Sequence, residues 1–168
     1  NLKQIGVNKI KYIGNIKFSL DYDFRKYNRI DKTIMNQSKF WCAASIHDGE
    51  EEIILNAHLK LKEKIKNLIT FIIPRHIINT QKIYQKSVSK GLNSQILNQD
   101  DVVLKNKEII IVNSFGLLSE FFNYCNNVFI GKSIMSRFEK DGGQNPIEAA
   151  KNGCKIFYGP NVSNFREI

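Results

Sequence analysis

Short apolar runs alternate with longer amphipathic runs through most of the chain. The apolar runs, which predict strands, are 39–44, 67–73, 107–112, 127–130 and 154–158. The runs between them, which predict helices, are 48–65, 80–90, 117–124 and 146–152, and the first of these carries Ile54, Ala57, Leu61 and Ile65 at helical spacing. Runs without a polar residue, such as 109–112, are typical of strands that are buried on both faces.

Strands that alternate with helices predict a parallel sheet with right-handed crossovers and helices on both faces. We therefore expect an α/β fold, a Rossmann-like doubly wound parallel sheet. Residues 9–16 offer either an edge strand or a connection from a neighbouring segment. At 168 residues the chain fits one domain, 1–168, which is large enough to bury a core without disulfides.

The three cysteines, Cys42, Cys125 and Cys154, each lie in an apolar run without the spacing of a metal site. We interpret them as buried hydrophobic residues of a protein from a reducing compartment. No apolar run approaches the ~20 residues needed to span a bilayer, and no signal peptide is visible. The chain starts without a methionine and stops in a segment typical of a first helical turn, so we expect an excised piece of a longer protein.

The chain is basic, with 25 Lys and Arg residues against 16 Asp and Glu residues and a net charge of +9. Such an excess favours anionic partners, which include nucleotides, nucleic acids and anionic membrane surfaces. The lysines are scattered along the predicted helices, as on solvated faces, and no basic stripe interleaved with aromatic residues is present. The charge therefore does not by itself indicate a nucleic-acid partner.

Unusual turns follow five predicted strands at the edge of the sheet where parallel strands end. In chain order these turns are Ser45–Gly49, Pro74–His76, Asn113–Gly116, Gly131–Ser133 and Gly159–Asn161. In open α/β sheets, ligands bind beyond the carboxyl ends of the strands. Five such turns on one edge therefore predict a ligand cleft there.

A further turn, at residues 142–148, joins two glycines to the start of a helix. Asn145 can serve as the N-cap, Pro146 suits the first helical position and Glu148 can close a capping box. A neutral glycine-rich turn before a helix is also a good anion site, because its free N–H groups point outward. On local grounds the turn either only starts a helix or also binds an anion.

Charged and histidine residues in these turns suggest different roles. Arg75, directly after a buried strand, can fork onto a phosphate or lie solvated in a loop, and His76 can donate to the same phosphate. Glu148 can accept both hydroxyls of a ribose, and Gly116 lets a base approach the backbone. We interpret His58, in the middle of a predicted helix, as structural. The sequence does not decide whether His47 binds a ligand or is structural.

Glu50, Glu51 and Glu52 crowd the first turn of their predicted helix. Acidic side chains suit the positive end of a helix dipole, but they make that end a poor phosphate site. Capping of the helix by Asp48 together with Glu51 is the alternative reading of this acidic turn.

Taken together, these motifs closely resemble the C-terminal half of the 3-deoxy-D-manno-octulosonic acid (Kdo) transferases, glycosyltransferases of lipid A synthesis in Gram-negative bacteria. The matching segments are 14–18, 44–51, 74–76, 142–148 and 159–165. The resemblance implies the GT-B architecture, in which two Rossmann-like domains face each other across a cleft. In that family the C-terminal domain holds the donor, CMP-Kdo, and the N-terminal domain holds the lipid acceptor and a glutamate general base.

By this resemblance, the chain is the donor-binding half of an enzyme of the cytoplasmic face of the inner membrane. The whole protein would transfer Kdo to a lipid A precursor with no metal or cofactor, touching the membrane surface peripherally and binding no nucleic acid. No catalytic residue would lie in this chain, and the chain alone would be inactive.

The resemblance also carries roles onto individual positions. Those implied to bind the nucleotide, CMP or the CMP part of CMP-Kdo, are Pro74, Arg75, His76, Phe115, Gly116, Leu117, Asn145, Pro146, Ile147 and Glu148. Those implied to line the sugar site or the cleft are Ser45, His47, Gly142, Gly143 and Asn161.

The chain departs from the family pattern at several of these turns. Asn113 and Leu117 stand where the family has acidic residues, Lys132 replaces a glycine and Gln144 replaces a histidine. An arginine that commonly follows Pro74–His76 is also absent. These departures bear on donor affinity and not on the fold.

Two other readings stay open. One is a different GT-B enzyme, a UDP-sugar transferase or a UDP-GlcNAc epimerase, which shares a ribose-binding glutamate. The other is a non-catalytic nucleotide or nucleic-acid binding module, for which the net charge is the only support. The number of Kdo residues transferred, the acceptor specificity and the oligomeric state do not follow from the sequence.

Overall fold

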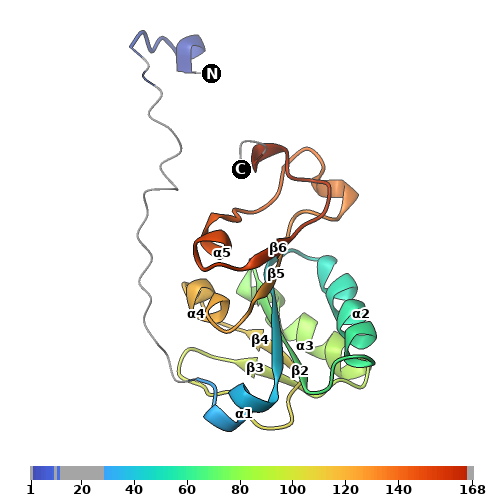
Figure 1. Ribbon diagram of the computed structural model, residues 1–168. Helices are drawn as coiled ribbons and strands as arrows, with labels where there is room; N and C mark the ends of the chain where they lie inside the picture. Colours follow the sequence, from blue (N-terminus) through green and yellow to red (C-terminus); the bar gives the residue numbers. More distant parts are fainter. Residues whose placement is uncertain (1, 10, 12–28, 166–168) are drawn as a thin grey trace.

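The computed structural model describes residues 2–9, 11 and 29–165 (Figure 1). Its strands are β1 (Lys39–Ile46), β2 (Leu68–Pro74), β3 (Ser94–Leu97), β4 (Ile109–Val112), β5 (Asn127–Ile130) and β6 (Lys155–Phe157). Its α-helices are α1 (Lys32–Gln37), α2 (Glu50–Lys62), α3 (Thr80–Ser89), α4 (Leu118–Phe122) and α5 (Ile147–Lys151). Short 3-10 helices are η1 (Leu2–Ile5), η3 (Ile77–Asn79), η4 (Ser136–Phe138) and η5 (Ser163–Phe165).

The six strands form one sheet in the order β3-β4-β2-β1-β5-β6, and every neighbouring pair is parallel. From β1 the chain first builds one side of the sheet, with β2 beside β1, β3 at the edge and β4 between them. It then crosses to β5 on the other side of β1. The strand order therefore reverses between β1 and β5. This reversal is the topological switch point at which open α/β sheets bind ligands.

The core has two halves, one on each face of the sheet. Along β4, Ile110 and Val112 belong to the half that includes α4 and α5, whereas Ile109 and Ile111 belong to the half with α2 and α3. Figure 1 shows α2 and α3 on one side of the sheet and α4 and α5 on the other. The side chains of a strand point alternately to the two faces of the sheet. A strand made only of apolar residues therefore needs apolar residues of helices packed on both faces. The predicted α/β doubly wound fold is confirmed.

Two elements were missed by the sequence pattern. Helix α1 buries only Ile34, so it has no apolar stripe, and it begins because Asp31 Oδ1 accepts the Thr33 N–H at 2.7 Å. Strand β3 has two apolar residues in four, and its pairing with β4, beginning at Ser94 and Ile109, stabilises it at the sheet edge. Residues 9–16 were expected to form either an edge strand or a connection, and residues 14–18 match the family. Apart from Lys9 and Lys11, both segments lie outside the described residues.

Candidate functional site

The backbone of β1 leaves regular strand geometry just before the switch point. Its register with β2 shifts between Ala44 and Ile46, and Ser45 lies between them with φ of 55°. Across the switch point, Lys132 after β5 also has positive φ, 59°. A Cβ on Gly131 would collide with the carbonyl oxygen of Ser45, so only glycine lets these two segments approach so closely. Non-glycine residues with positive φ concentrate at binding sites, and these two face each other across this edge.

The fully buried Glu50 carboxylate ties the two segments together. It accepts the backbone N–H of His47 at 3.0 Å, of Lys132 at 2.7 Å, of Ser133 at 3.1 Å and of Ile134 at 3.4 Å. Successive N–H groups of this kind form a nest that can hold an anion. Here the anion that the nest holds is a side chain of the protein.

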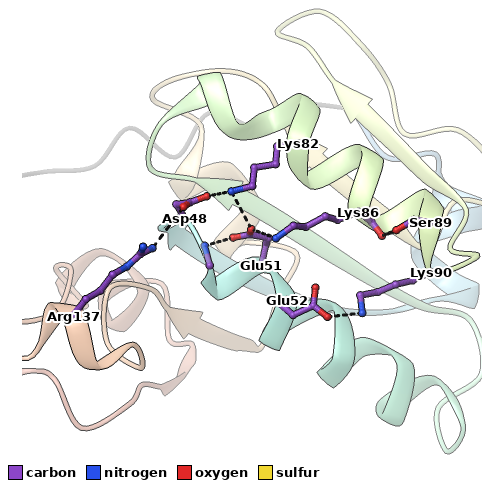
Figure 2. A network of polar contacts seen from close by, with 9 residues as sticks. Asp48, Glu51, Glu52, Lys82, Lys86, Ser89, Lys90 and Arg137 are labelled. Carbon is purple, nitrogen blue, oxygen red and sulfur yellow. Dashed lines mark hydrogen bonds and ion pairs between the residues drawn. The ribbon is translucent and has the colours of Figure 1, made fainter.

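The predicted capping of this helix by Asp48 is wrong. Helix α2 starts at Glu50 after Gly49, whose φ of 92° stops regular helix from extending further back. The Gly49 N–H donates to Glu51, and Asp48 instead pairs with Lys82 and, at 3.8 Å, with Arg137 (Figure 2). Positive φ at Gly49 turns the chain so that Asp48 points toward α3 and η4.

Helices α2 and α3 are joined by a row of ion pairs that Figure 2 shows side by side. Glu51, only 2% exposed at its side chain, contacts Lys86 at 2.6 Å and Lys82 at 3.8 Å. Further along, Glu52 contacts Lys90 at 2.6 Å. We call this row, with Asp48, the α2–α3 ion ladder. It holds the first turn of α2, and therefore Glu50, against the rest of the domain.

His47 lies where several edge loops meet. Its ring centroid is 5.7 Å from that of His76 and 5.2 Å from that of Phe138, and its Nε2 is 3.1 Å from Gln144 Nε2. Burial lowers the pKa of His47, the charges of Lys132, His76 and Arg75 lower it further, and only Glu50 opposes them. The structure thus brings together His47, His76 and the charge of Arg75, as the sequence predicted for one cleft.

Arg75 is exposed, and its backbone N–H donates to the Ile46 carbonyl at 2.9 Å. That bond fixes the loop after β2 against the end of β1 and leaves the guanidinium at the surface. Pro74, the last residue of β2, is buried and structural. An exposed guanidinium on a fixed backbone is suited to a bidentate contact with a phosphate.

The loop after β4 presents an aromatic ring. Phe115 is 71% exposed, Gly116 is exposed with φ of 77°, and Leu117 turns back into the core. Asn113 is held in place by Thr80 Oγ1 at 3.1 Å and by its own amide donating to Asn98 at 3.0 Å. An exposed ring beside a bare stretch of backbone is a surface on which a nucleobase can stack.

The capping box predicted for α5 is wrong, although the start of the helix was placed correctly to within one residue. Asn145 Oδ1 accepts the Ile147 N–H at 3.1 Å, and Pro146 immediately precedes the helix. The half-buried Glu148 carboxylate reaches α4 instead and accepts the Ser119 hydroxyl at 2.7 Å. Glu148 therefore does not cap α5, and its carboxylate is oriented by Ser119 of α4.

The glycine turn and Asn161 are explained by internal packing. A side chain on Gly142 would collide with Asn164, whose amide donates to the Gly143 carbonyl at 3.1 Å. Asn161 is buried and donates to the Met135 carbonyl at 2.8 Å. Of the residues predicted to line the cleft, Gly142 and Gly143 therefore lie against the 161–164 segment, to which Asn161 belongs. Ser45 and His47 lie at the switch point.

The surface of the described residues includes cavities at both edges of the sheet. One of about 510 Å³ lies beside the carboxyl edge, between Ile134, Glu139, Pro160 and Asn161. The other, about 490 Å³, lies at the amino edge of the sheet and has Lys62, Lys66, Lys105 and Lys107 in its wall. None of the residues predicted to bind a nucleotide lines the second cavity. None of them lines the first cavity either, although Asn161, predicted for the cleft, does.

Among the described residues, no group of three or more His, Cys, Asp or Glu side chains converges to hold a metal ion. Cys42, Cys125 and Cys154 are free thiols, and burial raises the pKa of each. No described helix is both long and apolar enough to cross a membrane.

Three contacts were not predicted from the sequence. They are the bond from Ser119 to Glu148, the contact of Gln144 with His47, and the bonds that Glu50 accepts from the loop after β5. Ser119 had a weak signal, since it lies just after the loop that follows β4. Glu50 was read only as one of three acidic residues in a first turn. Its contacts to residues more than 80 positions away depend on the pairing of β1 with β5, which no local pattern reveals.

The chain is similar to Kdo transferases over nearly its whole length. It is 29% identical over 163 residues to the 3-deoxy-D-manno-octulosonic acid transferase of Haemophilus influenzae, covering 95% of this chain and 37% of that protein. It is 31% identical over 160 residues to a probable mitochondrial 3-deoxy-D-manno-octulosonic acid transferase of Arabidopsis thaliana. That match covers 95% of this chain and 35% of the plant protein. The chain thus spans little more than a third of the length of these relatives. No family model matches it.

A solved structure has the same fold. The C-terminal CMP-Kdo binding domain of WaaA from Acinetobacter baumannii superposes with a TM-score of 0.70 at 21% identity, covering 79% of this chain and 67% of that one. The resemblance drawn from the sequence, and the α/β fold of a GT-B half, are confirmed by these two comparisons together.

Proposed function

We propose that this chain is the donor-binding half of a Kdo transferase, which holds CMP-Kdo while Kdo is transferred to a lipid A precursor. The observation that carries the proposal is the similarity to Kdo transferases, together with where the matching positions lie in the fold. The similarity to Kdo transferases covers 95% of the chain. The positions that match the family's nucleotide site, Arg75, Phe115 and Glu148, all follow or face the carboxyl ends of strands.

Each of these three side chains suits one part of CMP. The Arg75 guanidinium forks onto the phosphate, Phe115 with Gly116 stacks on the base, and Glu148 accepts ribose hydroxyls. Ser119 already donates to Glu148 Oε1, so the other carboxylate oxygen, Oε2, is better placed to accept from the ribose hydroxyls of CMP. Departure of CMP leaves negative charge on its phosphate, and Arg75 stabilises that charge.

The remaining parts of the reaction lie beyond these residues. We infer that an acceptor domain with the general base occupies much of the additional length of the relatives, and that the cleft between the two domains holds the lipid acceptor. The whole enzyme then works at the cytoplasmic face of the inner membrane of Gram-negative bacteria, and the basic charge of this chain favours a peripheral contact with that surface. The mechanism needs no metal, cofactor or nucleic acid.

Calorimetric titration of the chain with CMP, UMP and UDP tests the proposal. We expect CMP to bind more tightly than either uridine nucleotide. Tighter binding of UMP or UDP would instead favour a UDP-sugar enzyme. Binding that shows no base preference and collapses steeply with salt would favour a non-catalytic nucleic-acid module.

A further inference from the structure

The His47 ring lies at the meeting point of the loops after β1, β2 and β5. It is partly buried between His76 and Phe138, at ring distances of 5.7 and 5.2 Å. Burial lowers its pKa, and the cationic charges of Lys132 and Arg75 act in the same direction. In its neutral form the ring carries one proton, on either Nδ1 or Nε2.

Gln144 determines which nitrogen carries that proton. Its amide nitrogen lies 3.1 Å from His47 Nε2, and an amide nitrogen can only donate. Nε2 must then accept, so the proton resides on Nδ1. Within residues 29–165, Nδ1 of His47 makes no hydrogen bond. The ring thus offers one uncharged N–H donor to whatever binds at the switch point.

The ligand of the proposed function supplies an acceptor of matching position. In CMP-linked Kdo, the phosphate oxygen and the sugar carboxylate are bonded to the same carbon. A phosphate on Arg75 therefore brings the carboxylate close to the adjoining loop, where His47 lies. The Lys132 ammonium, which pairs with Asp141 at 3.6 Å, belongs to the same region. Aldose-derived nucleotide sugars have a hydrogen atom at that carbon and offer His47 no acceptor.

We propose that Gln144 holds His47 in the Nδ1–H tautomer, and that His47 thereby donates a hydrogen bond to the sugar carboxylate of the donor. The proposal rests on the proposed function, because it takes the donor to be CMP-Kdo. It makes His47 a specificity residue for 2-keto-acid sugars, and Gln144 its positioning residue.

The tautomer is measured directly by long-range ¹H–¹⁵N correlation spectra of the labelled chain at about pH 8, above the ordinary pKa of histidine. We expect the His47 nitrogen shifts of the Nδ1–H form. In Gln144→Leu, which removes the donor, we expect a shift toward a mixture of the two tautomers. An Nε2–H tautomer in the unaltered chain overturns the proposal, whatever the chain binds.

The carboxylate contact is measured by titration with CMP-Kdo and with CMP, which lacks the sugar. His47→Phe keeps a ring between His76 and Phe138 and removes the donor. We expect it to weaken CMP-Kdo binding roughly tenfold or more, the range for a hydrogen bond to a charged group, and CMP binding by less than about twofold. Gln144→Leu should show the same selectivity with a smaller loss.

Equal losses for the two ligands would overturn the carboxylate contact. This outcome differs from failure of the proposed function, in which the unaltered chain would bind neither CMP nor CMP-Kdo. Circular dichroism of both variants shows whether the fold is kept, and the tautomer measurement on the unaltered chain needs no variant.

Discussion

Arg75 combines a fixed backbone with an exposed side chain, so its loss should affect binding without affecting the fold. We expect Arg75→Ala to weaken CMP binding by about 1.5–3 kcal/mol, the range for hydrogen bonds to charged groups. Arg75→Lys should restore only part of this, because an ammonium lacks the planar fork. Calorimetry measures both. Lys60→Ala, which removes one exposed positive charge from the end of α2, is the charge-matched control, and unchanged affinity in Arg75→Ala would refute the phosphate contact.

Glu148 carries the ribose contact if the proposed function is correct. Glu148→Gln keeps an oxygen that can accept from Ser119, so the chain should stay folded. We expect this change to weaken binding of CMP more than binding of 2′,3′-dideoxy-CMP, which offers no hydroxyls. Titration of both proteins with both ligands isolates the contact. Equal losses for the two ligands would assign Glu148 a purely structural role.

His58 makes stability depend on pH. Its ring is fully buried, with Nδ1 2.7 Å from Thr70 Oγ1, and burial lowers its pKa. The unfolded chain therefore binds a proton below about pH 6.5 that the folded chain resists, so the free energy of unfolding should fall as pH decreases through that value. The lowered pKa of His47 acts in the same direction. Urea unfolding at a series of pH values from 8 to 5 measures how the free energy of unfolding changes with pH. His58→Gln should make this pH dependence weaker, and an unchanged pH dependence would show that His58 does not cause it.

At the scale of elements, the α2–α3 ion ladder predicts unequal effects from similar substitutions (Figure 2). Lys86 neutralises Glu51, whose side chain is 2% exposed, whereas Lys90 pairs with Glu52, which is 48% exposed. We expect Lys86→Met to lower the free energy of unfolding by about 1–2 kcal/mol, because it leaves a buried charge less well paired. The matched change Lys90→Met should cost less than about 0.5 kcal/mol. Chemical denaturation compares them, and a larger effect at Lys90 would show that burial does not rank these pairs.

Pairing between elements also explains why local signals were read incompletely. The Asp48 and Glu148 side chains were read as caps of their own helices, but each reaches a neighbouring helix, α3 or α4. The alternative partners lie at least 29 positions away, so a motif of three or four residues cannot reveal them. A side chain at a capping position can bond either to its own helix or to a tertiary partner. Here Asp48 and Glu148 both bond to the tertiary partner.

At the scale of the whole molecule, the chain should bind the donor and catalyse nothing. Group transfer requires both substrates to be held together, and the proposed acceptor site and general base belong to another domain. We expect CMP binding by calorimetry but no transfer of labelled Kdo to a lipid A precursor by the chain alone. Transfer above the rate without protein would refute the division of labour and place a catalytic group within these 168 residues.

The sequence alone determined the fold class and the edge of the sheet on which the candidate site residues lie. Apolar runs such as Ile109 to Val112 can only be satisfied by cover on both faces, and strands that alternate with helices can only form a parallel sheet in that setting. The carboxyl ends of those strands then follow from chain direction. This is why Arg75, Phe115 and His47 were placed on one edge before any contact was known.

Only the tertiary structure decided which of these residues meet. The position of β5 beside β1 brings Gly131 against Ser45 and gives Glu50 the N–H groups of residues 132–134. It also sets Gln144 against His47 and Ser119 against Glu148, pairs separated by 97 and 29 positions. Such contacts depend on strand order and on close approach of backbones, neither of which has a local period. The sequence therefore predicted the edge of the sheet that holds the candidate site residues, and the order of the strands decided which of them are neighbours.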